Sequence, residues 1–220
     1  MRVRVALPLA AFLAASAWCV LLLEVREHEY GDARYGFLVW NLALAWIPLV
    51  LAVLLAAAYS QRRSAVELIV LAAAWLVFLP NAPYVLTDFI HLGSEHRQFD
   101  AILLASFAFT SLALGFSSLL LVQLVVTRAA GAAIGWLVAL SSLLAASVGI
   151  YLGRIVRLNS WDVVQRPALL AQIVRDRLDD PFGNRHLIGF VVALCGFLTL
   201  AYCGLYGVTA LAASARRDRR

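Results

Sequence analysis

Long hydrophobic runs without charges constrain this chain more than any other feature. Hydrophobic residues occupy 63% of its 220 positions and charged residues only 14%, whereas a soluble domain typically has about 45–50% and about 25%. A run of about 20 apolar residues is long enough to cross a bilayer as a helix. Because the apolar residues are gathered into such runs, the sequence predicts a polytopic membrane protein.

Six runs predict an all-α transmembrane helical bundle that forms a single domain over residues 1–220. We expect spans near residues 5–23, 37–59, 65–86, 101–126, 132–153 and 187–213. The first run follows Arg2 and Arg4 and resembles a signal peptide. Its length without a charge nevertheless favours a retained span.

The polar segment between the fifth and sixth runs predicts one further helix, near residues 167–178. Pro167 suits a first helical turn, and Asp180 with Pro181 marks an end. Leucine, isoleucine and valine recur between these limits at helical spacing, with arginine and aspartate on the other side. We therefore expect an amphipathic helix in the membrane interface.

The basic residues concern membrane topology. All 18 are arginine, and they lie in the loops and tails between the apolar runs, so the net charge of +5 does not indicate nucleic-acid binding. The arginine counts of the two sides are equal. The clusters at the two chain ends favour cytoplasmic termini.

With six spans, the ends of spans one, three and five lie on the same side in either orientation. Parity therefore predicts that three polar groups can converge at one membrane face. They are Glu24, Glu27 and His28, then Asp88 and His91, then Arg154, Arg157, Asn159 and Asp162.

The third run contains Pro80-Asn81-Ala82-Pro83, which predicts a broken helix. Carbonyl groups freed by the break need hydrogen-bond partners, which Asn81 or neighbouring spans could supply. The break is then either a structural kink that Asn81 caps or a ligand-lining segment. Asn81 is for this reason a candidate ligand-binding residue.

Asp88 and His91 follow this break at a spacing that places both side chains on one helical face, with Thr87 or Asp88 as a cap. A carboxylate and an imidazole so placed could exchange a proton, ligate a metal or form interfacial hydrogen bonds. Interfacial hydrogen bonding is favoured, because a metal site needs further ligands. We therefore predict no metal site. Asp88, His91 and Asp162 are the catalytic candidates.

Arg154 and Arg157 end the fifth run on one helical face, followed by Asn159 and Asp162. Paired guanidinium groups suit a phosphate or carboxylate, so Arg154, Arg157 and Asn159 are candidate ligands for an anionic lipid or a phosphorylated substrate. The alternative is a salt bridge from Arg154 to an aspartate that ties two helix ends together. No residue pattern indicates a cofactor.

Small residues recur at four-residue spacing in the last three runs, for example Ser111 with Gly115 and Gly189 with Ala193. Such steps allow helix backbones to approach closely in lipid. We expect them to serve packing within one bundle. The sequence contains no evident internal repeat, so it does not predict an inverted-repeat transporter.

The motifs LPNAPYVLTDFIHL (79–92) and GRIVRLNSWD (153–162), followed by Arg166-Pro167, resemble a bacterial membrane-protein family catalogued as domain of unknown function 1361. Leu79 and Leu158 differ from the aromatic residues common in that pattern. The resemblance implies a multi-pass protein of the bacterial inner membrane and implies no activity.

Three functions are compatible with these patterns. The first is a polar site at one membrane face that binds, or processes, an anionic lipid or envelope precursor. The second is a small transporter or permeation pathway lined by the broken third helix. The third is a membrane scaffold or assembly factor without a ligand.

Overall fold

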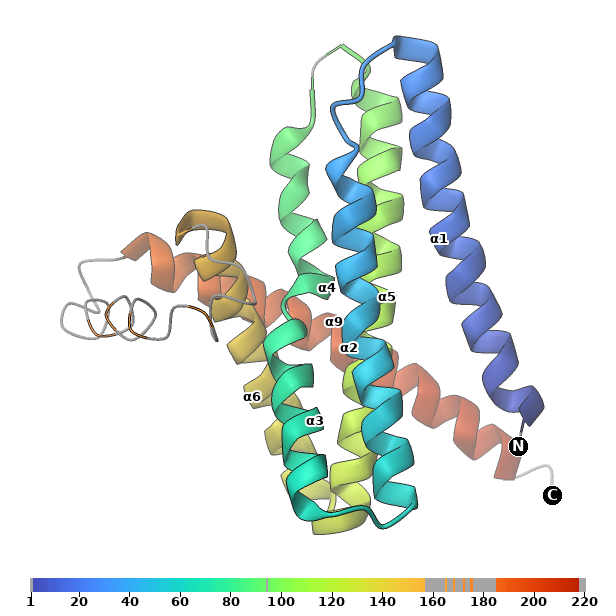
Figure 1. Ribbon diagram of the computed structural model, residues 1–220, viewed down its shortest axis with the longest axis vertical. Coiled ribbons are helices and arrows are strands. Elements are labelled where there is room, and N and C mark those ends of the chain that lie inside the picture. Colours follow the sequence, from blue (N-terminus) through green and yellow to red (C-terminus); the bar gives the residue numbers. More distant parts are fainter. Residues whose placement is uncertain are drawn as a thin grey trace. The chain divides into compact units, whose positions relative to one another are not determined.

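The computed structural model describes residues 2–93, 95–156 and 185–217 and the single positions 165, 168, 172 and 175. Its elements (Figure 1) are α1 (Arg2–Tyr30), α2 (Phe37–Ser60), α3 (Ala65–Phe78), α4 (Asn81–Tyr84), the 3₁₀ helix η1 (Val85–His91), α5 (Arg97–Ala130), α6 (Ala132–Tyr151), the π-helix η2 (Leu152–Val156) and α9 (Arg185–Arg217). These described parts contain helices and no strand.

Among the described residues, six helical segments are long and apolar enough to cross a membrane. They are Leu7–Tyr30, Phe37–Ser60, Ala65–His91, Arg97–Ala130, Ala132–Arg154 and Leu187–Ala212. The prediction of an all-α, multi-pass membrane protein is confirmed. The chain forms two compact units, Met1–Leu121 and Val122–Arg220, and α5 contributes to both.

The core of unit 1 (Met1–Leu121) is formed by α1, α2, α4, η1 and the first part of α5. Leu38, Leu103 and Phe107 are fully buried in it. Large side chains such as Phe109 remain mostly exposed, as is typical of a surface that faces lipid. Ser64 begins α3 by accepting a hydrogen bond from the backbone N–H of Glu67 (3.2 Å), the serine–glutamate spacing of a capping box.

The third span is broken where the prolines predict. α3 ends at Phe78, and the Nδ2 of Asn81 donates to the freed Phe78 carbonyl (2.9 Å). The span then continues through α4 and η1, which contact α2. Asn81 therefore caps the kink of its own helix.

Gly115 of α5 packs against this break. A Cβ atom built at Gly115 would lie 2.7 Å from the Cβ of Ala82 and 3.9 Å from the Cδ of Pro83. The neighbouring Ser111 is fully buried. Close backbone approach is thus confirmed at Gly115, whereas no described atom lies within 4 Å of the corresponding position at Gly189.

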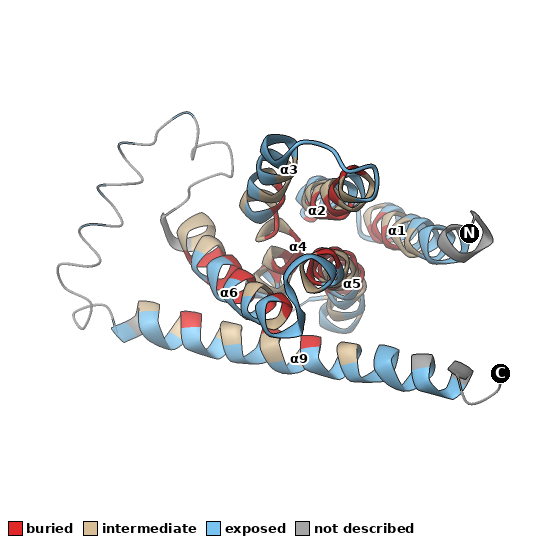
Figure 2. Ribbon diagram, turned by 90° about the horizontal axis from the view of Figure 1, so that it is seen from below, coloured by how far each residue is buried: buried red, intermediate tan, exposed pale blue. Residues whose placement is uncertain are grey.

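Unit 2 (Val122–Arg220) contains the end of α5, α6, η2 and α9. Trp136 of α6 packs edge-on against the rings of Tyr202 and Tyr206 of α9, and the hydroxyl of Tyr202 donates to the side-chain oxygen of Gln123. Figure 2 shows that the buried positions of α9 are few, and most of the helix is exposed. An aromatic and polar seam therefore holds α9 within this unit.

The predicted interfacial helix falls almost entirely outside the described residues. Within it only Ala168, Gln172 and Arg175 are described, and these three positions are helical and exposed. The candidate site residues Arg157, Asn159 and Asp162 also lie outside the described residues.

Candidate functional site

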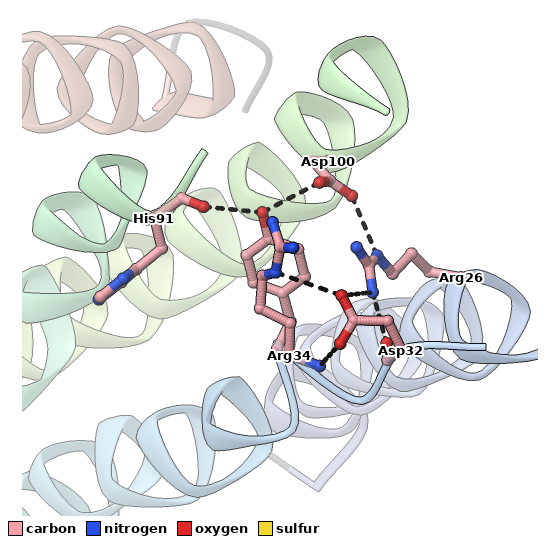
Figure 3. A network of polar contacts seen from close by, with 6 residues as sticks. Arg26, Asp32, Arg34, His91 and Asp100 are labelled. Carbon is pink, nitrogen blue, oxygen red and sulfur yellow. Dashed lines mark hydrogen bonds and ion pairs between the residues drawn. The ribbon is translucent and has the colours of Figure 1, made fainter. Parts of the chain in front are cut away.

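A group of charged and polar residues lies at one end of unit 1, where α1 ends and α5 begins. This arginine–aspartate cluster consists of Arg26, Asp32, Arg34, Tyr35 and Asp100 (Figure 3). α1 supplies Arg26 from its last turns, the loop between α1 and α2 supplies the next three residues, and α5 supplies Asp100 from its first turn. One loop and two helix ends therefore meet at this site.

The centre of the cluster is a buried ion pair. The Nε of Arg26 lies 3.1 Å from the Oδ1 of Asp100, and the two side chains are 2% and 1% exposed. Charges removed from water are costly unless they are paired and hydrogen-bonded. The pair is hydrogen-bonded further, because the other oxygen of Asp100 accepts from the hydroxyl of Tyr35 (3.0 Å).

Asp32 connects this buried pair to the exposed Arg34. Its Oδ2 lies 3.4 Å from the Nη1 of Arg26 and 3.2 Å from the Nε of Arg34. Its Oδ1 accepts from the backbone N–H of Arg34 (2.9 Å), a hydrogen bond typical of a local aspartate turn. Arg26 also donates to the backbone carbonyl of Asp32, so the loop is attached to α1 through main chain and side chain together.

Tyr35 is buried between the loop and the end of the third span. Its hydroxyl lies 2.9 Å from the carbonyl oxygen of His91 as well as 3.0 Å from Asp100, so one hydrogen faces two acceptors. The guanidinium carbon of Arg26 lies 4.8 Å from the centre of the tyrosine ring, within cation–π range. Burial raises the pKa of Tyr35, and the hydrogen bond to Asp100 raises it further.

This raised pKa predicts how Tyr35→Phe will respond to pH. A tyrosine in an unfolded chain has a pKa of about 10, so folding favours the protonated phenol. That contribution to stability is present below pH 10 and is lost as the pH rises through the folded pKa. We expect Tyr35→Phe to be less stable than wild type at neutral pH by about 1.5–3 kcal/mol. The difference should narrow above pH 10 in detergent unfolding curves, and a difference that is constant with pH would contradict the assignment.

The predicted residues Asp88 and His91 lie near this cluster in different environments. Asp88 is fully buried and accepts a hydrogen bond from the Nδ2 of Asn41 of α2 (2.9 Å). His91 is exposed, and its ring packs edge-on against Phe37. Only the backbone carbonyl of His91 is seen to join the network in Figure 3.

The prediction that Thr87 or Asp88 caps a short helix is wrong. Both residues lie inside η1, and Tyr84 occupies the position before it without a side-chain cap. The hydroxyl of Thr87 donates to the carbonyl of Tyr84 (2.7 Å). The reason is that the helical backbone resumes directly after Pro80, so no new helix start is left to cap.

Among the described residues, no group of three or more His, Cys, Asp and Glu side chains could hold a metal ion.

Arg154 lies in unit 2, where α6 ends in the π-helical turn η2. Its side chain is partly buried. Short π-helical turns occur frequently at functional sites because they change the direction in which side chains point. Arg154 therefore stays a candidate ligand-binding residue.

Comparison with known proteins identifies the family. The model of a family described as "Protein of unknown function (DUF1361)" matches residues 40–201. The chain belongs to the DUF1361 family. No curated protein and no solved structure matches the sequence. The DUF1361 match includes Asp100 and Arg154, whereas Arg26 and Arg34 precede it.

The DUF1361 motif at the third span gives no structural support to a permeation pathway. Its Asn81 is engaged with the Phe78 carbonyl, and Gly115 packs closely against Ala82. The backbone break is therefore filled by a neighbouring helix. The geometry of this motif is that of a packed kink.

The arginine–aspartate cluster of this DUF1361 protein was not predicted as a site. A usable signal was present, because the loop after span one and the loop after span three lie on one side by parity. Each carries an ionisable residue next to an apolar run, Arg26 in one and Asp100 in the other. Opposite charges at the same membrane face are candidates for pairing, although their distance cannot be read from the sequence.

Proposed function

We propose that this end of unit 1 binds the phosphate-bearing headgroup of an anionic lipid or lipid-linked envelope precursor, with Arg34 as the main contact. One observation carries the proposal. Within the described residues Arg34 uses only its Nε for an ion pair, and its side chain is 47% exposed. Its two terminal nitrogens form no ion pair with the described residues. A planar guanidinium binds phosphate through such a pair of nitrogens.

The surroundings of Arg34 suit a lipid better than a free phosphate. Exposed apolar side chains occupy the adjoining helix ends, Phe37 and Trp40 in the first turn of α2 and Phe89 and Ile90 in the last turn of η1. Aromatic residues of this kind gather at the level of the headgroups. A lipid could therefore place its phosphate at Arg34 and its acyl chains beside these exposed apolar side chains.

The described geometry supports binding more strongly than bond cleavage. Asp88 is buried against Asn41, so it does not present its carboxylate to a ligand at the surface.

We propose Arg154 as a separate anion contact within unit 2, because it lies in a π-helical turn. We propose Arg157 and Asn159 as further residues of this contact. We also propose that both termini are cytoplasmic, because arginines cluster at the two chain ends.

The proposal predicts a loss of lipid selectivity in Arg34→Gln. We expect the affinity for dioleoylphosphatidylglycerol to fall roughly fivefold, since one arginine near a charged headgroup contributes about 1 kcal/mol. Affinity for dioleoylphosphatidylcholine should change less. Native mass spectrometry of the purified protein titrated with each lipid measures both. Glycerol 3-phosphate, which has the same phosphate and no acyl chains, should compete weakly.

Arg97→Gln is the matched control. Arg97 is an exposed arginine in the first turn of α5, at the same end of unit 1, and forms no ion pair with the described residues. If any exposed arginine at this end had the same effect, phosphatidylglycerol affinity would fall equally in both variants. That result would contradict the assignment of Arg34 as the main contact. Strong competition by glycerol 3-phosphate would reject the lipid as the ligand.

A second candidate function is an assembly scaffold, favoured by the internal pairing of Arg26 with Asp100. Such a pair ties the first and fourth spans together without any ligand. In that case both lipids would bind wild type and Arg34→Gln alike. A stable protein partner would instead co-purify with the intact protein.

A further inference from the structure

We propose that Asp32 is an internal counter-ion of the headgroup site, which occupies Arg34 in the empty state and releases it when a lipid phosphate binds. The inference rests on the proposed function of Arg34 and adds its regulation. It predicts that the carboxylate of Asp32 competes with the ligand. The competition would keep the site selective for groups that bind a guanidinium more strongly than a carboxylate does.

The geometry allows this exchange because one oxygen serves two arginines. The Oδ2 of Asp32 lies 3.2 Å from the Nε of Arg34 and 3.4 Å from the Nη1 of Arg26. A small rotation of the carboxylate is enough to favour either cation. Asp32 is itself 41% exposed and Arg34 is 47% exposed, so a headgroup phosphate can approach this ion pair from solvent.

The two ion pairs of Asp32 differ in how easily they can be given up. The pair with Arg34 joins two half-exposed side chains, and exposed pairs contribute little to stability. Arg26 is 2% exposed and holds the loop through the carbonyl of Asp32 as well. Loss of the outer contact therefore leaves no buried charge unpaired, since Arg26 retains Asp100 and Asp32.

Gly93 contributes to the same arrangement from the segment after η1. A Cβ atom at this position would lie 2.7 Å from the Nη1 of Arg34 and 3.7 Å from an oxygen of Asp100. The absence of a side chain gives the guanidinium room to lie across the loop. Asp32 pairs with one edge of Arg34, and the missing side chain at Gly93 leaves the space that the Nη1 of Arg34 occupies.

The test compares phosphatidylglycerol affinity in Asp32→Asn with that in wild type, using the full chain in detergent and native mass spectrometry. Asparagine keeps an oxygen that can accept from the Arg34 backbone N–H, and it removes the negative charge. We expect affinity to rise roughly two- to fivefold, the range that follows from losing one exposed ion pair as a competitor. Glu29→Gln, which removes an exposed carboxylate at the end of α1, is the matched control and should raise the affinity less.

The double variant Asp32→Asn with Arg34→Gln separates the inference from the proposed function. If Asp32 acts through Arg34, removing its charge should have no effect on lipid affinity once Arg34 is absent. The counter-ion role is overturned if Asp32→Asn raises lipid affinity equally in wild type and in Arg34→Gln, or if it raises lipid affinity no more than Glu29→Gln does. Either result leaves Arg34 as a contact. No loss of affinity in Arg34→Gln alone overturns the proposed function and the inference with it.

Discussion

Replacing Arg26 with glutamine is expected to destabilise the protein by about 3–5 kcal/mol, the usual result of removing one partner of a buried ion pair. Asp100 would remain 1% exposed with its charge uncompensated. The variant also loses the hydrogen bond to the Asp32 carbonyl and the contact with the Tyr35 ring. Equilibrium unfolding in detergent micelles measures the change.

The matched control is Arg34→Gln, the same substitution at the other arginine that contacts Asp32. Its side chain is 47% exposed, so the expected loss of stability is at most about 1 kcal/mol. The double variant Arg26→Gln with Asp100→Asn should recover part of the loss, because no buried charge is left. Equal destabilisation by the two arginine variants would show that burial of the Arg26–Asp100 pair has no special weight.

Replacing Gly115 with alanine is expected to cost about 1–3 kcal/mol, although alanine is the better helix former. The new methyl group would lie 2.7 Å from the Cβ of Ala82, with the Ala82 backbone 4.0 Å away. Neither atom is the end of a flexible side chain, so the backbone of the broken span has to move. Thermal unfolding in detergent should show a lower transition temperature.

Ala82→Gly tests the cause of that loss. Removing the facing methyl group should restore much of the stability of Gly115→Ala, although glycine at position 82 adds its own helix penalty of about 1 kcal/mol. Gly204→Ala is the control, since no atom of the described residues lies within 4 Å of its added Cβ, and it should be neutral or slightly stabilising. No rescue by Ala82→Gly would refute the contact as the cause.

The apolar runs and the prolines made the architecture predictable from sequence. Bilayer thickness fixes the length of a span, and a proline removes a helix donor wherever it lies, so both signals are local. The break after Phe78 and its capping by Asn81 follow from residues within three positions of each other. Local chemistry was therefore sufficient for the spans and for the kink.

The candidate site was less predictable because it depends on contacts far apart in the sequence. Asp88 and His91 attract attention as ionisable residues near the end of an apolar run, yet Asp88 is buried against Asn41 of another span. Arg26 and Asp100 are ordinary loop-edge residues by sequence, and only the folding of α1 beside α5 makes them a pair. Parity puts the two loops that follow spans one and three on one side of the membrane, but it does not give the distance between Arg26 and Asp100.

The order of synthesis gives the loop between α1 and α2 a role in assembly. Arg26 emerges from the ribosome 74 residues before Asp100, which at about 5–20 residues per second is an interval of roughly 4–15 s. Asp32 follows Arg26 after only six residues. We therefore expect Asp32 to pair with Arg26 during the seconds before Asp100 is synthesised, so that the arginine has a counter-ion in the growing chain.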